Sequence, residues 1–168
     1  MQIRVLRECC AWETFDRPSL VLIYGPNGAG KTRLPSTLAD LLRVRMGSAI
    51  LHCSAHQLVE SLVENIKRGS CERFRNGLMT YRALLIDNIW VLACRPHAAE
   101  EIFCCFRKCL RQGSPVFIAS DMAPAAISTW SDEIGDIIKE SRIFQWGFNG
   151  GQVFKISILQ KYGEEVRS

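Results

Sequence analysis

Short apolar runs alternate with longer amphipathic segments along the chain. Leu20–Tyr24, Ala83–Asp87 and residues 115–119 are almost continuously apolar, as is typical of strands buried on both faces of a parallel sheet. Shorter runs at residues 49–52 and 143–148 predict two further strands. Strands that alternate with helices form parallel sheets covered on both sides. The pattern therefore predicts an α/β fold in three layers around a mostly parallel, five-stranded sheet.

The segments between these strands carry apolar residues at spacings of three and four, which places them on one side of a helix. Helices are predicted over residues 5–12, from a glycine-rich loop to Arg43 or Arg45, behind a capping box formed by Ser54 and Gln57, over residues 98–112, at Pro124, and over residues 132–140. The inner faces of the second and third of these helices are predicted to hold Leu34, Leu38, Leu41, Leu42, Leu58, Val59, Leu62, Val63 and Ile66.

The composition is that of a single folded domain. The chain has 168 residues, of which 48% are hydrophobic and 23% charged. The longest stretch without Asp, Glu, Lys or Arg, residues 46–59, is shorter than the roughly 18 residues that a membrane-spanning helix needs. Residues 1–10 lack the apolar core of a signal peptide, so we expect a cytoplasmic protein with no membrane partner.

Eight cysteines and a small positive charge complete the picture. A cytoplasmic protein keeps its thiols reduced and no C-x-x-C pair occurs, so we expect the cysteines to pack as small apolar residues. Cys105 and Cys109, taken with Cys104 or His97, lack the two short ligand pairs of a structural zinc site. The net charge of +4 permits contact with nucleic acid without specifying it.

A glycine-rich loop joins the strand Leu20–Tyr24 to the following helix. It satisfies the phosphate-binding motif G-x-x-x-x-G-K-[ST] with Gly25, Pro26, Asn27, Gly28, Ala29, Gly30, Lys31 and Thr32. In such a loop the backbone N–H groups and the helix N-terminus face an anion, the lysine neutralises the outer phosphates, and the hydroxyl of the last residue ligates Mg²⁺. The sequence thus predicts a P-loop site for ATP or ADP with Mg²⁺, in which Thr32 is a metal ligand.

The end of another buried strand supplies the acid that such a site needs. Asp87 follows the apolar run 84–86 and is the predicted second contact to Mg²⁺, through water. Asn88 occupies the next position, where many P-loop ATPases place the carboxylate that polarises the attacking water. An amide orients water but does not accept its proton, so we expect nucleotide binding with slow hydrolysis.

Taken together, the motifs resemble the AAA+ domain of the DnaA and Hda family of bacterial replication proteins. The resemblance rests on LVLIYGPNGAGKT, on SAHQLVESLVENIKRGSCERF, on LLIDNIWVLACRPHAAEEIFCCF, and on FIASDMAPAAI with SRIFQWGF. It implies that Ser120 and Asp121 form the sensor 1 region beside the γ-phosphate. It also implies that Arg142 is an arginine finger that reaches the ATP of a neighbouring subunit.

The same resemblance implies a surface for single-stranded DNA. Arg95 and His97 match basic positions with which similar initiators hold the strand, and Val63 matches an apolar contact of that surface. The position between the two basic residues is Pro96, where the chain departs from the pattern. Without the resemblance, these residues would be interpreted as an ordinary solvated loop and helix.

The chain departs from the family at both ends. Only eighteen residues precede Ser19, fewer than the family uses to enclose adenine, so we expect weak recognition of the base. Residues 1–150 are assigned to the AAA+ core and residues 151–168 to a remnant of the first lid helix, through KISILQKYGEE. The lid is thus expected to be largely missing, and the helix-turn-helix domain that reads duplex DNA to be absent.

Several functions are compatible with these residues. The leading hypothesis is a DnaA-like protein that binds ATP with Mg²⁺, hydrolyses it slowly at most, and acts in the initiation of DNA replication or its control. An Hda-like adaptor without turnover, which docks on a DnaA-like AAA+ partner, is the first alternative. A helicase loader of the DnaC or IstB kind, a small-molecule kinase and a degenerate remnant are the others. The absence of a basic lid and an acceptor pocket argues against a kinase.

Overall fold

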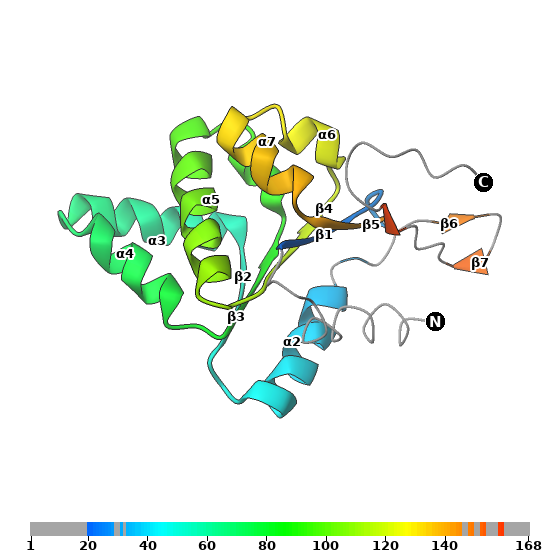
Figure 1. The fold of residues 1–168 in the computed structure, drawn as a ribbon, viewed down its shortest axis with the longest axis horizontal. Coiled ribbons are helices and arrows are strands. Elements are labelled where there is room, and N and C mark those ends of the chain that lie inside the picture. Colours follow the sequence, from blue (N-terminus) through cyan, green and yellow to red (C-terminus); the bar gives the residue numbers. More distant parts are fainter. Residues whose placement is uncertain are drawn as a thin grey trace.

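The computed structural model describes residues 20–28, 31, 33–145, 148–149, 152–153 and 158–159. Within these residues, a central sheet has the strand order β2-β3-β4-β1-β5-β8 and a separate hairpin pairs β6 with β7 (Figure 1). The strands are β1 (Leu20–Tyr24), β2 (Ile50–Ser54), β3 (Ala83–Asp87), β4 (Val116–Ser120), β5 (Arg142–Gln145), β6 (Phe148–Asn149), β7 (Gln152–Val153) and β8 (Ile158–Leu159). The helices are α2 (Arg33–Met46), α3 (Ala55–Lys67), α4 (Cys71–Met79), η2 (Ile89–Leu92), α5 (Pro96–Arg111), α6 (Pro124–Ile127) and α7 (Asp132–Lys139).

The predicted five-stranded parallel sheet is confirmed. Strands β2, β3, β4, β1 and β5 all run parallel, and β1 lies between β4 and β5. The bounds of β1 and β3 coincide with the two apolar runs that predicted them. Strand β5 ends at Gln145, earlier than the predicted residue 148, and β2 extends to Ser54. All parallel strands end at one edge of the sheet, which is where the polar residues of the site lie.

One prediction at the edge of the sheet is wrong. Ile158 and Leu159 form the strand β8, antiparallel to β5, where the family resemblance implied the first lid helix. Ile158 lies opposite Phe144 and Leu159 opposite Ile143, so these residues pair with an edge that would otherwise present open backbone groups. The remaining residues of that predicted helix lie outside the described part of the chain, as does the predicted helix 5–12.

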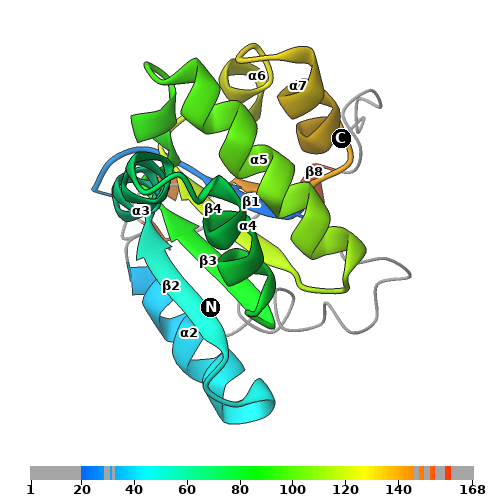
Figure 2. The same ribbon diagram turned by 90° about the vertical axis from the view of Figure 1, so that its left-hand side faces the viewer.

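The two faces of the sheet carry two hydrophobic cores of different size. Strand residues alternate between the faces, so that Leu20 and Leu22 of β1 belong to the larger core and Val21 and Ile23 to the smaller one. Helix α2 closes the smaller core, whereas α3, α4, α5 and α7 cover the opposite face, as Figures 1 and 2 show. Cys105 and Cys109 pack within the larger core, and burial raises the pKa of Cys105 to about 12.

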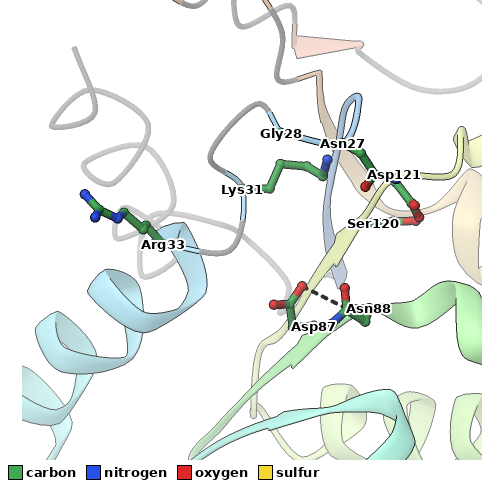
Figure 3. A pocket seen from close by; sticks show the side chains of 8 residues that line it. All are labelled: Asn27, Gly28, Lys31, Arg33, Asp87, Asn88, Ser120 and Asp121. Carbon is green, nitrogen blue, oxygen red and sulfur yellow. Dashed lines mark hydrogen bonds between the residues drawn. The ribbon is translucent and has the colours of Figure 1, made fainter.

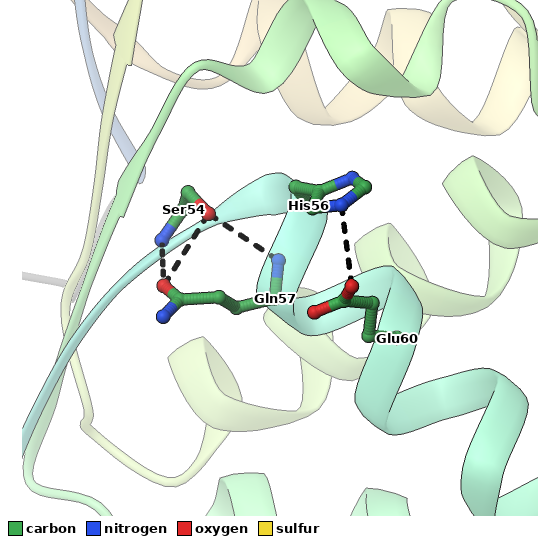
Figure 4. Close-up of polar contacts among 4 residues, drawn as sticks. All are labelled: Ser54, His56, Gln57 and Glu60. Carbon is green, nitrogen blue, oxygen red and sulfur yellow. Dashed lines mark hydrogen bonds and ion pairs between the residues drawn. The ribbon is translucent and has the colours of Figure 1, made fainter.

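The capping box that predicted α3 is present (Figure 4). The Gln57 N–H donates to Ser54 Oγ over 3.3 Å, and the Ser54 N–H donates to Gln57 Oε1 over 2.9 Å. In the first turn of the helix, His56 lies 3.2 Å from Glu60, which is one turn further on along the exposed side. The helix therefore begins directly at the end of β2, which fixes the side of the sheet to which the chain crosses.

The predicted inner faces of the second and third helices, which are α2 and α3, are correct only in part. Leu34, Leu38, Leu42, Leu58, Val59 and Leu62 are buried as expected. Leu41 is 40% exposed, Val63 41% and Ile66 55%, because a helix that packs against one layer buries a narrower stripe than spacing alone predicts. No helix within the described residues is both long and apolar enough to cross a membrane.

Candidate nucleotide-binding site

A cavity of about 310 Å³ opens where the parallel strands end (Figure 3). In open α/β sheets, ligands bind outside the carboxyl ends of the strands, and this cavity has that position. Three strands contribute to it, because loop residues follow β1, β3 and β4. The described residues that line it are Asn27, Gly28, Lys31, Arg33, Asp87, Asn88, Ser120 and Asp121.

The predicted phosphate loop forms the rim of this cavity. Its start is tied to the sheet, because the Gly25 N–H donates to the carbonyl of Ser120 over 3.1 Å. Gly28 has φ +79°, a left-handed conformation that glycine adopts without a steric penalty. Helix α2 starts as the Leu34 N–H donates to the Lys31 carbonyl over 2.9 Å. Ala29, Gly30 and Thr32, the last a predicted metal ligand, lie outside the described residues.

Lys31 places a buried ammonium group at the centre of the site. Only 9% of the residue is exposed, and Nζ donates to the carbonyl oxygens of Gly25 and Pro26 in its own loop. Burial lowers the pKa of Lys31, and the carboxylates of Asp121 and Asp87 oppose this by favouring the charged form. The lysine therefore lies within electrostatic reach of both acids, with its donors turned to backbone oxygens that a phosphate can replace.

Asp87 and Asn88 form the floor of the cavity at the end of β3. The Asn88 N–H donates to Asp87 Oδ1 over 2.8 Å (Figure 3). Asn88 has φ 56° and ψ 46°, the only left-handed non-glycine residue in the described part of the chain. Asparagine and aspartate tolerate this conformation better than other side chains because their short polar groups bond locally. The amide at this position is thus compatible with the turn, and so is the acid that the family resemblance implies.

Ser120 and Asp121 lie at the end of the neighbouring strand β4. The Ser120 hydroxyl accepts a hydrogen bond from the Met122 N–H over 2.9 Å, so the side chain is held by its own turn. Asp121 Oδ1 is buried and has no hydrogen-bond partner among the described residues. A buried carboxylate oxygen without a donor is costly, and such groups are often completed by an ion, a water or a ligand.

These side chains fit a magnesium polyphosphate. Two carboxylates in the same cavity as a lysine supply hard oxygen ligands and a counter-charge, and Mg²⁺ prefers oxygen ligands with bound water. The uncompleted Oδ1 of Asp121 is the observation that favours an ion or an ordered water at this place. The site thus combines a cationic rim for phosphate with an anionic floor for a metal.

Arg33 is a cavity residue that the sequence did not predict as part of the site. It is the first residue of α2 and lines the cavity at the end away from Asp121. A cation at the first helical position directly after the phosphate loop was the available signal. The phosphate-binding motif ends at Thr32 and therefore does not include Arg33.

The other predicted residues do not join this cavity. Arg142 begins β5 opposite Val21, which lies three residues, or roughly 10 Å, before the end of β1 where the phosphate loop starts. It is exposed, and burial of part of its side chain lowers its pKa. Arg95, which donates to the Val91 carbonyl over 2.7 Å, and His97 are exposed at the start of α5, and Val63 lies on α3.

The fold and this site together define the class of P-loop NTPases. The sequence of residues 11–149 matches the family model of the bacterial DnaA ATPase domain. Since the match covers most of the chain, the protein belongs to the DnaA ATPase-domain family. Its AAA+ fold is thereby established.

Individual relatives agree with this assignment. The chromosomal replication initiator protein DnaA 2 of Chlamydia caviae is 32% identical over 127 residues, which are 76% of this chain and 26% of the relative. A structure of DnaA bound to AMPPCP and single-stranded DNA is 25% identical with a TM-score of 0.74 and covers 84% of this chain and 44% of that one. Domain III of DnaA from Thermotoga maritima, at 20% identity, has a TM-score of 0.76 over 86% of this chain and 61% of that one. The chain spans about a quarter of the length of the curated relatives that it matches.

Proposed function

We propose that this protein binds ATP or ADP with Mg²⁺ at the P-loop cavity. The observation that carries the proposal is the position of Lys31, a buried ammonium within electrostatic reach of Asp87 and Asp121 and hydrogen-bonded to carbonyls of its own loop. A phosphate offers Lys31 charge-assisted hydrogen bonds, which are stronger than those to a neutral carbonyl. That a DnaA structure is bound to AMPPCP supports an adenine nucleotide as the ligand.

Each group of the cavity has a part in holding this ligand. In a P-loop the backbone N–H groups face the phosphates, and Gly28 has the left-handed conformation that such a loop uses. Lys31 would move from the Gly25 and Pro26 carbonyls to the outer phosphates. Asp87, with the Thr32 hydroxyl predicted from the motif, would hold the metal. Bound Mg²⁺ would neutralise charge that develops between the outer phosphates.

Hydrolysis at this site is slow in our proposal. An attacking water would be oriented by Asn88 and by Asp121, but the Asn88 amide does not accept a proton. In a P-loop ATPase the proton must leave the water as its oxygen attacks the γ-phosphorus and the bond to ADP breaks. The amide at position 88 therefore favours a protein that holds its nucleotide over one that turns it over rapidly.

We further propose that Arg142 contacts the nucleotide of a neighbouring subunit and not the nucleotide in the cavity of its own chain. Its place on β5 puts it near the start of the strands, roughly 10 Å from the edge at which the phosphate loop lies. An arginine there reaches a nucleotide held by a second DnaA-like AAA+ subunit, as the family resemblance implies. Assembly through Arg142 would then depend on nucleotide.

The proposed biological role is in the initiation of DNA replication or its regulation. The DnaA bound to single-stranded DNA supports a DNA surface on this chain, formed by Val63, Arg95 and His97. An Arg95→Ala variant should weaken the anisotropy change of a labelled oligo-dT strand several-fold, by the loss of one phosphate contact. Arg111→Ala, which removes the same charge at the far end of α5, is its control, and equal binding by both variants would contradict this surface.

Asn88 also favours a second candidate, an Hda-like adaptor that uses its nucleotide as a regulatory ligand. Such an adaptor would bind a full-length DnaA-like partner and hydrolyse no ATP on its own. A helicase loader remains a fold-level alternative, because the DnaC helicase loader has a TM-score of 0.63 at 12% identity. A pull-down against purified DnaA and replicative helicase separates these roles by the protein that is captured.

Nucleotide binding itself is tested by an equilibrium titration with fluorescent ATP and ADP in the presence of Mg²⁺. Lys31→Ala should lower the affinity roughly 100-fold, the loss expected of charge-assisted hydrogen bonds to phosphate. Lys67→Ala, at the exposed end of α3, removes the same charge away from the cavity and should leave the affinity unchanged. Equal affinities of the wild type and Lys31→Ala would overturn the proposed function.

A further inference from the structure

Arg33 places a second cation at the rim of the P-loop cavity. It is the first residue of α2, two positions after Lys31, and it lines the cavity. Figure 3 shows Asp121 and Ser120 at one end of the cavity and Arg33 at the other, with its guanidinium turned away from the cavity. The two cations of the cavity thus differ, because Lys31 is buried and within electrostatic reach of the acids, whereas Arg33 is exposed and lies at the end away from Asp121.

The position of Arg33 is electrostatically unfavourable unless an anion is bound. A helix N-terminus carries a partial positive charge, and the first turn of α2 contains no acidic residue to offset it. Among the described residues, no hydrogen bond or ion pair engages the Arg33 guanidinium, although the Arg33 carbonyl accepts from the Thr37 hydroxyl over 2.9 Å. Arg43, in the last turn of the same helix, is the opposite case, since it pairs with Asp40 over 3.0 Å where the helix dipole favours a cation.

The acids of the cavity set the direction in which a polyphosphate lies. Asp87 and Asp121 repel phosphate unless a metal lies between them, so the metal-bound outer phosphates belong at their end, next to Lys31. With the outer phosphates at that end, the phosphate next to the nucleoside would lie at the opposite end of the cavity, where Arg33 is.

We propose that Arg33 binds the α-phosphate of the nucleotide. The guanidinium is a planar fork that matches two phosphate oxygens, and rotation about the side-chain torsions turns it from solvent into the cavity. This proposal rests on the proposed function, because it requires nucleotide at the P-loop. It makes the nucleoside-bound phosphate, present in both ATP and ADP, a recognition element that inorganic pyrophosphate lacks.

The test compares three ligands on four proteins. Wild type, Arg33→Gln, Arg33→Lys and Arg43→Gln are titrated with fluorescent ATP, and ATP, ADP and pyrophosphate are then used as competitors with Mg²⁺. Arg43→Gln is the matched control, since it removes the same charge from the other end of α2. We expect Arg33→Gln to lower the affinity for ATP and ADP by about tenfold, as for the loss of a hydrogen bond to a charged group. Its affinity for pyrophosphate should fall by less than about twofold. Arg33→Lys, which keeps the charge but not the fork, should lie between.

The outcomes separate this proposal from the proposed function. Equal ATP affinities of Arg33→Gln and Arg43→Gln would overturn the role of Arg33. An equal loss for pyrophosphate would overturn the assignment to the α-phosphate, because Arg33 would then act only as a general positive charge. The Lys31→Ala titration tests the P-loop itself. The melting temperature of Arg33→Gln should equal or exceed that of the wild type, so a loss of affinity reflects the contact and not unfolding.

Discussion

The two ends of the cavity differ in how closely their residues match those of a P-loop ATPase. At the loop end, Gly28 has the left-handed conformation of a phosphate loop and Lys31 presents a buried ammonium. At the strand end, Asp87 is the proposed contact to Mg²⁺, and the next residue is the amide Asn88. The described residues thus include the lysine expected to hold phosphate, whereas the position expected to activate water carries an amide.

Under the proposed function, nucleotide binding and hydrolysis at this site depend on different groups. Phosphate is held by backbone dipoles and one lysine, which act without any proton transfer. Hydrolysis requires a proton acceptor at a defined place, and a single change from acid to amide removes it without disturbing the turn that presents it. The left-handed backbone of Asn88 suits asparagine and aspartate alike.

The largest effect is expected from restoring the acid. Asn88→Asp should raise the ATP turnover rate roughly 100-fold, the usual contribution of a positioned general base. The variant should keep its ATP affinity within a few-fold, since Lys31 and the loop are untouched. Steady-state phosphate release and the fluorescent ATP titration measure the two quantities separately.

Asn27→Asp is the matched control for this prediction. It adds the same charge to the lining of the cavity, but on the phosphate loop and not at the end of β3. If the ATP turnover rate of Asn88→Asp equals that of the wild type, the missing carboxylate at position 88 is not what limits hydrolysis. The loss of hydrolysis would then lie elsewhere, with Arg142 of a neighbouring subunit as the next residue to test.

The sheet and the phosphate loop were predictable because their signals are local. Strands β1 and β3 are continuous apolar runs that end in a glycine and an acid, and their observed bounds coincide with those runs. The capping box of Ser54 and Gln57 likewise marked the start of α3. Apolar spacing alone overestimated the buried faces, and Leu41 and Ile66 are exposed because each helix packs against one layer only.

The site was predictable in its parts but not in its arrangement. Asp121 entered through a family resemblance, and nothing in the sequence indicates that one of its oxygens lacks a partner. The contact of Lys31 with carbonyls of its own loop depends on the folded loop and is likewise invisible in the sequence. Arg33 lies just beyond the phosphate-binding motif, so the motif does not predict its place in the lining of the cavity.

A smaller effect concerns the pH dependence of binding at the loop end. Burial lowers the pKa of Lys31, so its proton leaves at a lower pH than that of an ordinary lysine, near 10.5. ATP affinity should fall several-fold as the pH rises through this depressed value, and the affinity of Lys31→Ala should show no such fall. The free energy of unfolding of the nucleotide-free protein should change in the opposite direction. It should increase as the pH rises over the same range, because the folded state favours the neutral lysine. Titrations and urea unfolding at a series of pH values check both signs.

The smallest effect is expected at the strand end, in the stability of the nucleotide-free protein. Asp121→Ala removes a buried oxygen that lacks a donor and should raise the free energy of unfolding by about 1 kcal/mol, the lower part of the cost of such a group. Asp136→Ala, which breaks an exposed pair with Lys139, is the control and should change it by less than about 0.5 kcal/mol. Urea unfolding measures both free energies.

A loss of stability in Asp121→Ala would contradict this prediction. It would show that the attraction of Asp121 for Lys31 outweighs the cost of burying a carboxylate oxygen without a hydrogen-bond donor. A gain in the free energy of unfolding would mean that Asp121 destabilises the nucleotide-free protein. Its carboxylate oxygen would then find a favourable partner only when a ligand is bound.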